Sequence, residues 1–263
     1  MSPTRSLRLD PASNRGRSLR RPTPAQLVEL GALDHIQLTE LEARELMPAI
    51  DGLLGAIDAV CALPSVDVPQ SHYTQRDSGR RPTQGEDPWN AFVRICDIQG
   101  APSGLLAGKT VALKDNIDVA GVPTTNASAT LPYTPVRDAV VVERILAAGG
   151  RIVGKLNMDD FAAGASGETS AYGPPLNPRD PSRSPGGSSG GSGSAVASRA
   201  ADMALGGDQA GSARIPASFC GVVAIKATHG LVPSQGVTYL DHSIDFVCPM
   251  AATVDDAALL LEA

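Results

Sequence analysis

A dense run of glycine and serine between Ser184 and Arg214 is the first feature of the sequence that could do chemistry. Eight glycines and seven serines fill 15 of its 31 positions. A flexible linker would share this composition, but the run also holds the ordered patterns 195–201 and 203–205 and the compact, charged stretch 208–214. Glycines let backbone N–H groups approach a ligand closely. The pattern therefore favours an ordered loop that binds a ligand.

Lysine is rare in this chain and supplies a second signal. Only four of the 22 Lys and Arg residues are lysines, and Lys114 directly follows the apolar, β-branched run 110–113. That run predicts a strand, and the carboxyl ends of strands carry the sites of open α/β sheets. The apolar strand before Lys114 favours burial. A buried lysine loses its proton more readily and can act as a base.

A different catalytic arrangement is also compatible with the glycine-rich run. Residues 186–190 match the G-x-S-x-G pattern of hydrolases in which a histidine is the base. In those enzymes the serine lies between a strand and a helix, whereas here a proline-rich stretch precedes Ser188. His229 and His242 are the only histidines downstream, and His229 has turn-like neighbours. A Ser–His–Asp triad therefore stays a weakly supported alternative.

Taken together, these features resemble the amidase signature family. The resemblance extends from about Gly108 to the last residue and depends on several motifs in the family's order. They are GKTVALKDNI at 108–117, GGSSGGS at 186–192, GDQAGSARIP at 207–216, FCGV at 219–222 and CPMAATVDDAA at 248–258. The resemblance implies an α/β fold, an α/β/α sandwich around a mixed sheet. Family members are roughly twice as long, so we expect a sandwich that is incomplete at the C-terminus, with a helical N-terminal extension.

The resemblance also implies a role for each residue that matches the family's motifs. Lys114 is implied as the catalytic base, Ser188 as a bridging serine that follows a cis peptide bond, and Ser212 as the nucleophile that forms an acyl-enzyme. A neutral lysine can activate a serine through a second hydroxyl. An oxyanion hole is implied at the backbone N–H groups of Gln209, Ala210, Gly211 and Ser212. A supporting shell is implied at Ser189, Asp208 and Arg214.

One residue of the implied site departs from the family's pattern. Ala210 stands where most members have glycine, and its Cβ restricts the backbone conformation. The Ala210 amide can still donate a hydrogen bond, so the departure bears on efficiency more than on identity. The resemblance implies no metal and no cofactor.

We expect from this resemblance an amidase that hydrolyses a small-molecule carboxamide to a carboxylate and ammonia. The chain resembles bacterial amidases of nitrile-derived amides in the residues of the motif around Gln209, in THGLVP at 228–233 and in the helical extension. One alternative is the amidase subunit of a tRNA-dependent amidotransferase, which Gln209 and the extension make less favoured. Another is a catalytically inactive, truncated fragment. For partners we expect no nucleic acid and no membrane, and either a homo-oligomer or a missing C-terminal half.

Hydrophobic periodicity and turn residues divide the chain into three parts. We expect a disordered tail at 1–24, a helical extension and loop at 25–107, and the N-terminal half of an amidase signature domain at 108–263. Thr39 and Glu42 fit a capping box that begins a helix. Pro48 is expected to divide that helix or to start its second part. Residues 64–107 are rich in Pro, Gly and Ser, which predicts a long loop.

The rest of the pattern predicts alternating strands and helices. Residues 110–113, 151–156, 203–205 and 222–225 are expected as strands, with helices at 139–148 and 194–201 and from Asp255 onward. Asp138 is the expected cap of the helix at 139–148. The order strand–helix–strand predicts parallel pairing in an α/β sheet.

Composition limits the classes of protein that the chain can belong to. With 3% aromatic and 42% hydrophobic residues, the core must consist of Ala, Val, Leu and Ile. The net charge of −6 and the pI of about 5.2 argue against a nucleic-acid-binding protein. No apolar run reaches the roughly 18–20 residues of a membrane helix. Four distant cysteines without a C-x-x-C pair, and no secretory signal, predict reduced thiols and a cytoplasmic location.

Overall fold

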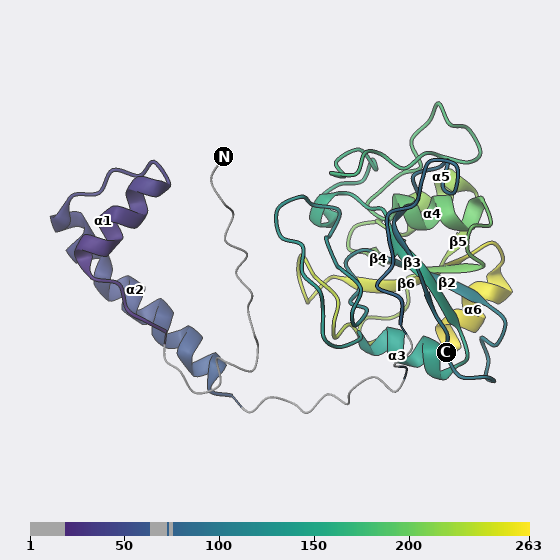
Figure 1. Cartoon of the computed structure of the whole chain (residues 1–263), viewed down its shortest axis with the longest axis horizontal. Coiled ribbons are helices and arrows are strands. Elements are labelled where there is room, and N and C mark those ends of the chain that lie inside the picture. Colours follow the sequence, from purple (N-terminus) through teal and green to yellow (C-terminus); the bar gives the residue numbers. More distant parts are fainter. Residues whose placement is uncertain (1–18, 64–72, 74–75) are drawn as a thin grey trace. The chain divides into compact units, whose positions relative to one another are not determined.

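The chain forms two compact units, Met1–Pro69 and Gln70–Ala263. The computed structural model describes residues 19–63, 73 and 76–263 (Figure 1). Most of the expected tail, residues 1–18, lies outside the described residues, and a helix already begins at Pro24. Each unit is described by itself below.

The first unit contains a short helix, α1 (Pro24–Leu33), packed against a longer one, α2 (Glu40–Cys61). Thr39 and Glu42 form the expected capping box at the start of α2. The expected division at Pro48 is wrong, because α2 continues through it. Pro48 is exposed, so water can satisfy the carbonyl group that loses its helical partner.

The second unit is built on a mixed six-stranded sheet in the order β1-β3-β2-β4-β6-β5. Strand β2 pairs in parallel with β3 and with β4, and the other three pairings are antiparallel. The strands are β1 (Phe92–Ile98), β2 (Thr110–Lys114), β3 (Arg151–Leu156), β4 (Met203–Asp208), β5 (Val223–Ala224) and β6 (Phe246–Ala251).

Several elements differ from the expectations drawn from sequence. The expectation of a loop over 64–107 is wrong at residues 92–98, which form β1. Strand β1 pairs with β3, so the sheet begins upstream of Gly108. Strand β6 was not predicted, although it pairs with β4 along its whole length. Asp138 does not cap the following helix, whose N-cap is Ala139. Its carboxylate instead accepts from the backbone N–H of Ala120 and pairs with Arg76.

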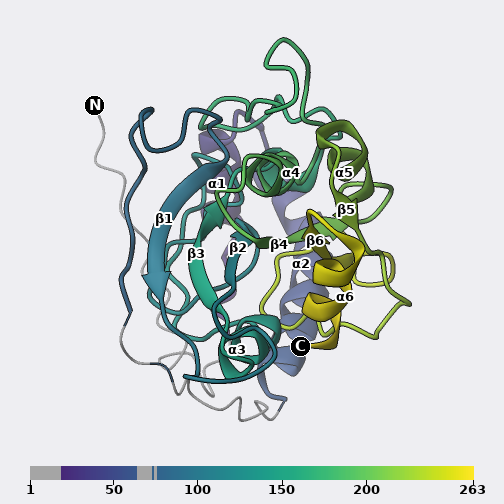
Figure 2. The same cartoon turned by 90° about the vertical axis from the view of Figure 1, so that its right-hand side faces the viewer.

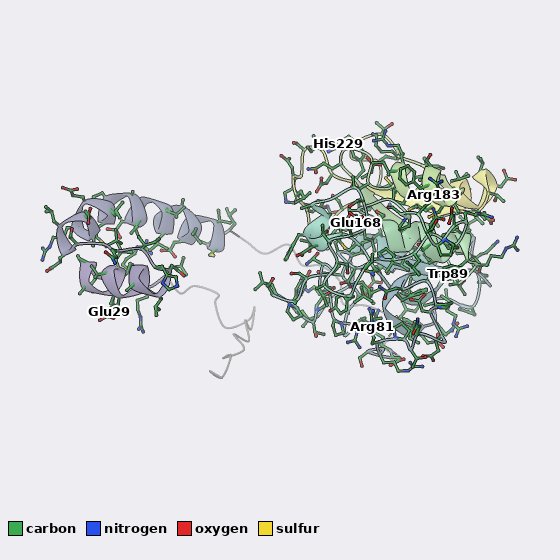
Figure 3. The ribbon with its side chains drawn as sticks, turned by 90° about the horizontal axis from the view of Figure 1, so that it is seen from above. Glu29, Arg81, Trp89, Glu168, Arg183 and His229 are labelled. Atoms are coloured by element: carbon green, nitrogen blue, oxygen red, sulfur yellow. The ribbon has the colours of Figure 1, made fainter. Side chains whose placement is uncertain are left out.

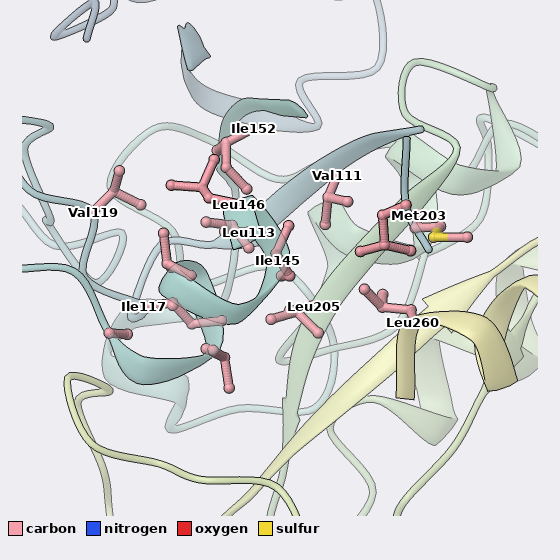
Figure 4. Packing of buried hydrophobic residues seen from close by; sticks show 14 of the residues in the cluster. Val111, Leu113, Ile117, Val119, Ile145, Leu146, Ile152, Met203, Leu205 and Leu260 are labelled. Carbon is pink, nitrogen blue, oxygen red and sulfur yellow. The ribbon is translucent and has the colours of Figure 1, made fainter. Parts of the chain in front are cut away.

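Helices cover both faces of the sheet, which confirms the expected α/β/α sandwich. Figure 2 shows α3 (Val140–Ala147) and α6 (Val254–Glu262) on one face, and α4 (Gly190–Ala197) and α5 (Arg214–Cys220) on the other. Alternate strand residues point to opposite faces. Val111 and Leu113 of β2 join the α3/α6 core (Figure 4), whereas Ala112 joins the α4/α5 core.

Close packing of α4 against the sheet depends on glycine. A Cβ on Gly191 would lie 2.4 Å from the carbonyl oxygens of both Ala91 and Asn157. The N–H of Gly191 donates to that Asn157 oxygen at 2.9 Å. The glycine therefore lets the first turn of α4 sit against the segments beside β1 and β3, where it carries the preceding serines.

No helix in the described part of the chain is both long and apolar enough to cross a membrane. Cys96, Cys220 and Cys248 are buried and unpaired, and Cys61 is exposed and unpaired.

Candidate active site

Lys114 is the last residue of β2 and lies on the face of the sheet that α4 and α5 cover. Its side chain is buried, with 1% of the residue exposed. Its Nζ donates to the Oγ of Ser188 at 2.7 Å. Strand β2 therefore carries the lysine and the glycine-rich loop carries the hydroxyl group that it bonds, which is the pairing that the family resemblance implied.

Burial sets the protonation of Lys114. Removal from water lowers the pKa of its ammonium group to about 8, and acidic groups around it oppose part of that effect. These groups are Asp159, Cys248, Asp208 and Asp245, in order of decreasing influence. A pKa near 8 leaves a useful fraction of the amine neutral close to physiological pH, which a general base requires.

Backbone hydrogen bonds at Ser188 and at the next residue hold the segment that carries the Ser188 side chain. The Gly187–Ser188 peptide bond is cis, as the family resemblance implied. The carbonyl oxygen of Ser188 accepts from the N–H of Asp159 at 3.0 Å. One residue later, the N–H of Ser189 donates to the carbonyl oxygen of Ser212 at 3.0 Å. This bond ties the two serine-bearing segments together.

Ser212 faces the same pocket as Lys114 and Ser188. Among the described residues, no hydrogen bond joins the Oγ of Ser212 to the Oγ of Ser188. The expected chain of three groups is thus formed at the Lys114–Ser188 step and open at the Ser188–Ser212 step. Catalytic hydrogen bonds are often long in structures without substrate and shorten when substrate binds.

The carboxylate of Asp208 organises the loop between β4 and α5. It accepts from the N–H groups of Gly211 at 3.0 Å and Ala213 at 3.2 Å, and from the guanidinium of Arg214 at 2.9 and 3.0 Å. Burial acts to raise the pKa of Asp208, but Arg214 and the backbone donors together hold it below its ordinary value. The Oγ of Ser189 braces the strand before this loop through both backbone groups of Gly207, at 3.1 Å each.

The backbone donors near Ser212 differ in one respect from the expectation. The N–H of Gly211, expected in an oxyanion hole, is already bonded to Asp208. The N–H groups of Gln209, Ala210 and Ser212 have no hydrogen-bond partner among the residues that the structure describes. Gly211 is therefore corrected to a residue that shapes the loop, with a φ of 137° that favours glycine.

Segments that the sequence reasoning passed over complete the pocket. Residues 237–240 and 245–247 line it together with the serines, and Asn116 and Ala162 also contribute. Phe246 opens β6 and pairs with Asp208 of β4, so the antiparallel strand carries it to the site. Because β6 was not predicted, only its direct continuity with the CPMAATVDDAA motif could have located Phe246.

The histidine alternative lacks support in this structure. His229 is exposed at the outer surface (Figure 3), where a ring nitrogen lies 3.3 Å from the carbonyl oxygen of His242. Its ring packs edge-on to Phe246 at 5.4 Å. In the part of the chain described, neither histidine is hydrogen-bonded to a serine hydroxyl. Over the same residues, no three His, Cys, Asp or Glu side chains gather in a way that could hold a metal ion.

Comparison with known proteins places the chain in a family. The family model described as Amidase matches residues 94–263. In Halobacterium salinarum, a glutamyl-tRNA(Gln) amidotransferase subunit is 54% identical over 174 residues, covering 66% of this chain and 41% of that protein. The protein of the same name from Anaeromyxobacter dehalogenans is 46% identical and covers 86% of this chain and 42% of its own length.

Solved structures agree with this assignment. The crystal structure of the corresponding glutamyl-tRNA(Gln) amidotransferase subunit from Thermotoga maritima has a TM-score of 0.62 at 43% identity, covering 68% of this chain and 40% of that one. A peptide amidase from Stenotrophomonas maltophilia has a TM-score of 0.58 at 40% identity, covering 61% and 34%.

The chain belongs to the Amidase family, a family of amide-hydrolysing enzymes. It spans about two fifths of the length of the curated relatives that it matches.

Two expectations change with these relatives. The expectation of no nucleic-acid partner is wrong as a guide to this chain, because the curated relatives are named as amidotransferase subunits for glutamyl-tRNA(Gln). The helical extension also does not disfavour an amidotransferase subunit, contrary to the expectation from sequence. A match that covers 86% of the chain extends well upstream of Gly108.

Proposed function

We propose that this chain contributes the amide-hydrolysing site of an amidotransferase subunit that takes ammonia from the side-chain amide of glutamine. The observation that carries the proposal is the hydrogen bond from the buried, easily deprotonated Lys114 to Ser188, with Ser212 in the same pocket. The relatives named as amidotransferase subunits favour this use of the site over hydrolysis of free amides.

The first half of the proposed reaction forms an acyl-enzyme. The Oγ of Ser212 attacks the amide carbonyl while its proton passes to Ser188, whose own proton passes to the neutral amine of Lys114. The N–H groups of Gln209, Ala210 and Ser212 stabilise the negative oxygen of the tetrahedral intermediate. The intermediate collapses when the lysine ammonium returns a proton through Ser188 to the leaving nitrogen, which departs as ammonia.

The second half releases the carboxylate. A water molecule attacks the acyl carbon, and its proton follows the same route through Ser188 to Lys114. The Ser212–acyl bond breaks, and Ser212 regains its proton from Lys114 through Ser188. Atoms and protons balance without a metal or cofactor.

Transfer of the ammonia to glutamyl-tRNA would take place outside the site described here. We propose that glutamyl-tRNA is a partner of the assembly to which this chain belongs, because the curated relatives are named for it. A cytoplasmic location, where tRNA is charged, stays a prediction.

A second candidate is a stand-alone amidase for small carboxamides. The resemblance of the motif around Gln209 to bacterial amidases favours it, as does the likeness to a peptide amidase. The two candidates differ in the substrate that they hydrolyse and in their need for partner subunits.

A labelling experiment followed by an ammonia assay tests both candidates. A fluorophosphonate probe should attach to Ser212 in the purified chain, as located by mass spectrometry. Ammonia release from glutamine that needs added amidotransferase partner subunits supports the first candidate. Release from propionamide or benzamide by the chain alone supports the second. No labelling of the folded chain would contradict both and favour the inactive-fragment alternative.

A further inference from the structure

Asp159 contacts the backbone of the segment that contains the bridging serine, Ser188. It follows β3 and is fully buried. Its N–H donates to the carbonyl oxygen of Ser188 at 3.0 Å. Its carboxylate also packs against Gly187, the residue before Ser188. A Cβ added to Gly187 would lie 2.0 Å from Oδ2 of Asp159. One acidic residue thus contacts the serine segment through both its backbone and its side chain.

The carboxylate of Asp159 is held by neutral donors. It accepts from the N–H of Gly167 at 3.0 Å, from the N–H of Thr169 at 3.2 Å and from the Oγ1 of Thr169 at 3.0 Å. Among the described residues it takes part in no ion pair, so its negative charge is not cancelled by a cation. These donors fix its position without neutralising it.

The other acidic groups around Lys114 differ from Asp159 in their charge or in the partners that hold them. Asp208, at the end of β4, is paired with Arg214. Asp245, before β6, is like Asp159 held by neutral donors only, the N–H groups of Leu240 and Asp241, and it exerts a weaker effect on the lysine. Cys248, on β6, is a buried thiol whose pKa is raised to about 12, so it is uncharged at neutral pH. Asp159 exerts the largest opposing effect on the lysine.

We infer that Asp159 is a positioning residue of this site: its backbone N–H fixes Ser188, and its buried carboxylate, which no cation pairs among the described residues, acts on the Lys114 amine bonded to that serine. The inference builds on the proposed function, because it gives the base of that reaction its working pH. Burial alone would favour the neutral amine further, and the nearby carboxylate opposes this effect.

The small number of lysines makes a direct test practical. Protein labelled with ¹³C at lysine Cε should give signals from Lys109, Lys114, Lys155 and Lys226 only, and Lys114→Met identifies the Lys114 signal. Titration by NMR then gives the midpoint for Lys114. Asp159→Asn keeps the shape and removes the charge, so the midpoint should fall by about one pH unit.

A neighbouring residue provides the matched control. Asp160→Asn makes the same chemical change one position along the chain, and Asp160 is not among the groups that act on Lys114. Its midpoint should equal that of the unmodified chain. A folded Asp159→Asn chain with an unchanged Lys114 midpoint would overturn the inference.

A second variant covers the case in which Asp159→Asn does not fold. Thr169→Val removes the hydroxyl that donates to the carboxylate and leaves its charge in place. With one donor fewer, the negative charge of Asp159 should act more strongly on the Lys114 ammonium group. The Lys114 midpoint should therefore rise, which is opposite to the effect of Asp159→Asn. A folded Thr169→Val chain with an unchanged or lowered midpoint would also overturn the inference.

The rate of fluorophosphonate labelling separates this inference from the proposed function. If Asp159 sets the base, the acid limb of the labelling rate should move to lower pH in Asp159→Asn by the same amount as the NMR midpoint. A purely structural role would slow labelling at every pH without moving the limb, which would count against the inference. Absence of labelling in the unmodified chain would refute the proposed function, while the NMR titration would still decide the role of Asp159.

Discussion

At the residue scale, Lys114 meets two opposing demands. A base must be neutral, so the lysine is buried at the end of β2, where its charged form is disfavoured. The folded chain must nevertheless tolerate that lysine at neutral pH. Asp159 and the hydrogen bond to Ser188 reduce the cost of burial without removing it.

Ser212→Ala should abolish covalent labelling by a fluorophosphonate, because it removes the proposed nucleophile. Ser182→Ala is a suitable control, since Ser182 is exposed and its hydroxyl bonds within its own turn to Asp180. Intact-mass spectra of both variants would check this. Full labelling of a folded Ser212→Ala chain would remove Ser212 from the role.

Variants of Lys114 and Ser188 compare how much each of these two side chains contributes to the labelling rate. Lys114→Ala should slow labelling by several orders of magnitude, because it removes the base that is hydrogen-bonded to Ser188. Ser188→Ala should cost less, since a water molecule can bridge the gap. Time courses of labelling measure both, and a smaller loss for Lys114→Ala than for Ser188→Ala would contradict the proposed route of the proton.

The pKa of Lys114 also predicts how stability depends on pH. The unfolded chain binds the lysine proton up to pH 10.5, whereas the folded chain releases it near pH 8, so stability should rise with pH between these values. Lys114→Met lacks this burden and should be more stable at pH 7 by about 2 kcal/mol, allowing for the lost hydrogen bond.

Thermal melts of both chains at pH 7 and about pH 9.5, between the folded and unfolded pKa values, would test this. The advantage of Lys114→Met should shrink at the higher pH. A variant that is less stable than the parent at both values would show that Lys114 contributes more packing and bonding than its buried charge costs.

At the element scale, the site depends on how closely α4 approaches the sheet. Parallel strands β2 and β4 bring Lys114 and Asp208 to the same edge. The first turn of α4 reaches that edge because Gly191 leaves room for two carbonyl groups. The serines that precede α4 are thereby placed over the lysine.

Gly191→Ala should therefore destabilise the second unit by about 1–3 kcal/mol, the usual cost of overpacking. Gly52→Ala, in α2, is the matched control, because both substitutions add a methyl group to a helix. A Cβ at Gly52 has no neighbour within 4 Å, so helix propensity alone should stabilise α2 by about 0.5–1 kcal/mol. Urea unfolding of the two variants measures the difference. Equal effects would mean that α4 can shift without cost.

At the scale of the whole molecule, the residues that line the candidate site all come from one of the two units. Every residue of the candidate site, from Lys114 to Val247, belongs to the unit Gln70–Ala263. The described residues of the unit Met1–Pro69 contribute none of them. A match to one curated relative nevertheless covers 86% of the chain and extends into this first unit.

A chain that starts at Gln70 should keep the labelling rate of Ser212 and its pH dependence, because the sheet and all lining residues remain. Labelling of the shortened and full chains side by side at several pH values would check this. A strong loss of labelling in a shortened chain that still folds would show that the first unit supports the site.

The sequence by itself predicted the candidate residues and their order along the chain. Lys114 after an apolar strand and the ordered glycine-rich run are local signals, because strand ends and glycine-rich turns are set by nearby residues. The family resemblance of the motifs then singled out Ser188 and Ser212. The capping box at Thr39 and Glu42 is equally local, and it was confirmed.

Only the tertiary structure decided how distant segments complete the site. Strands β1 and β6 owe their pairing to β3 and β4, far away in sequence, so composition alone made 92–98 a loop and left 246–251 unassigned. The bond from Gly211 to Asp208 removed an expected oxyanion donor. Asp159 became visible as a neighbour of Lys114 because folding buries their charges together, and burial is a property of the assembled core.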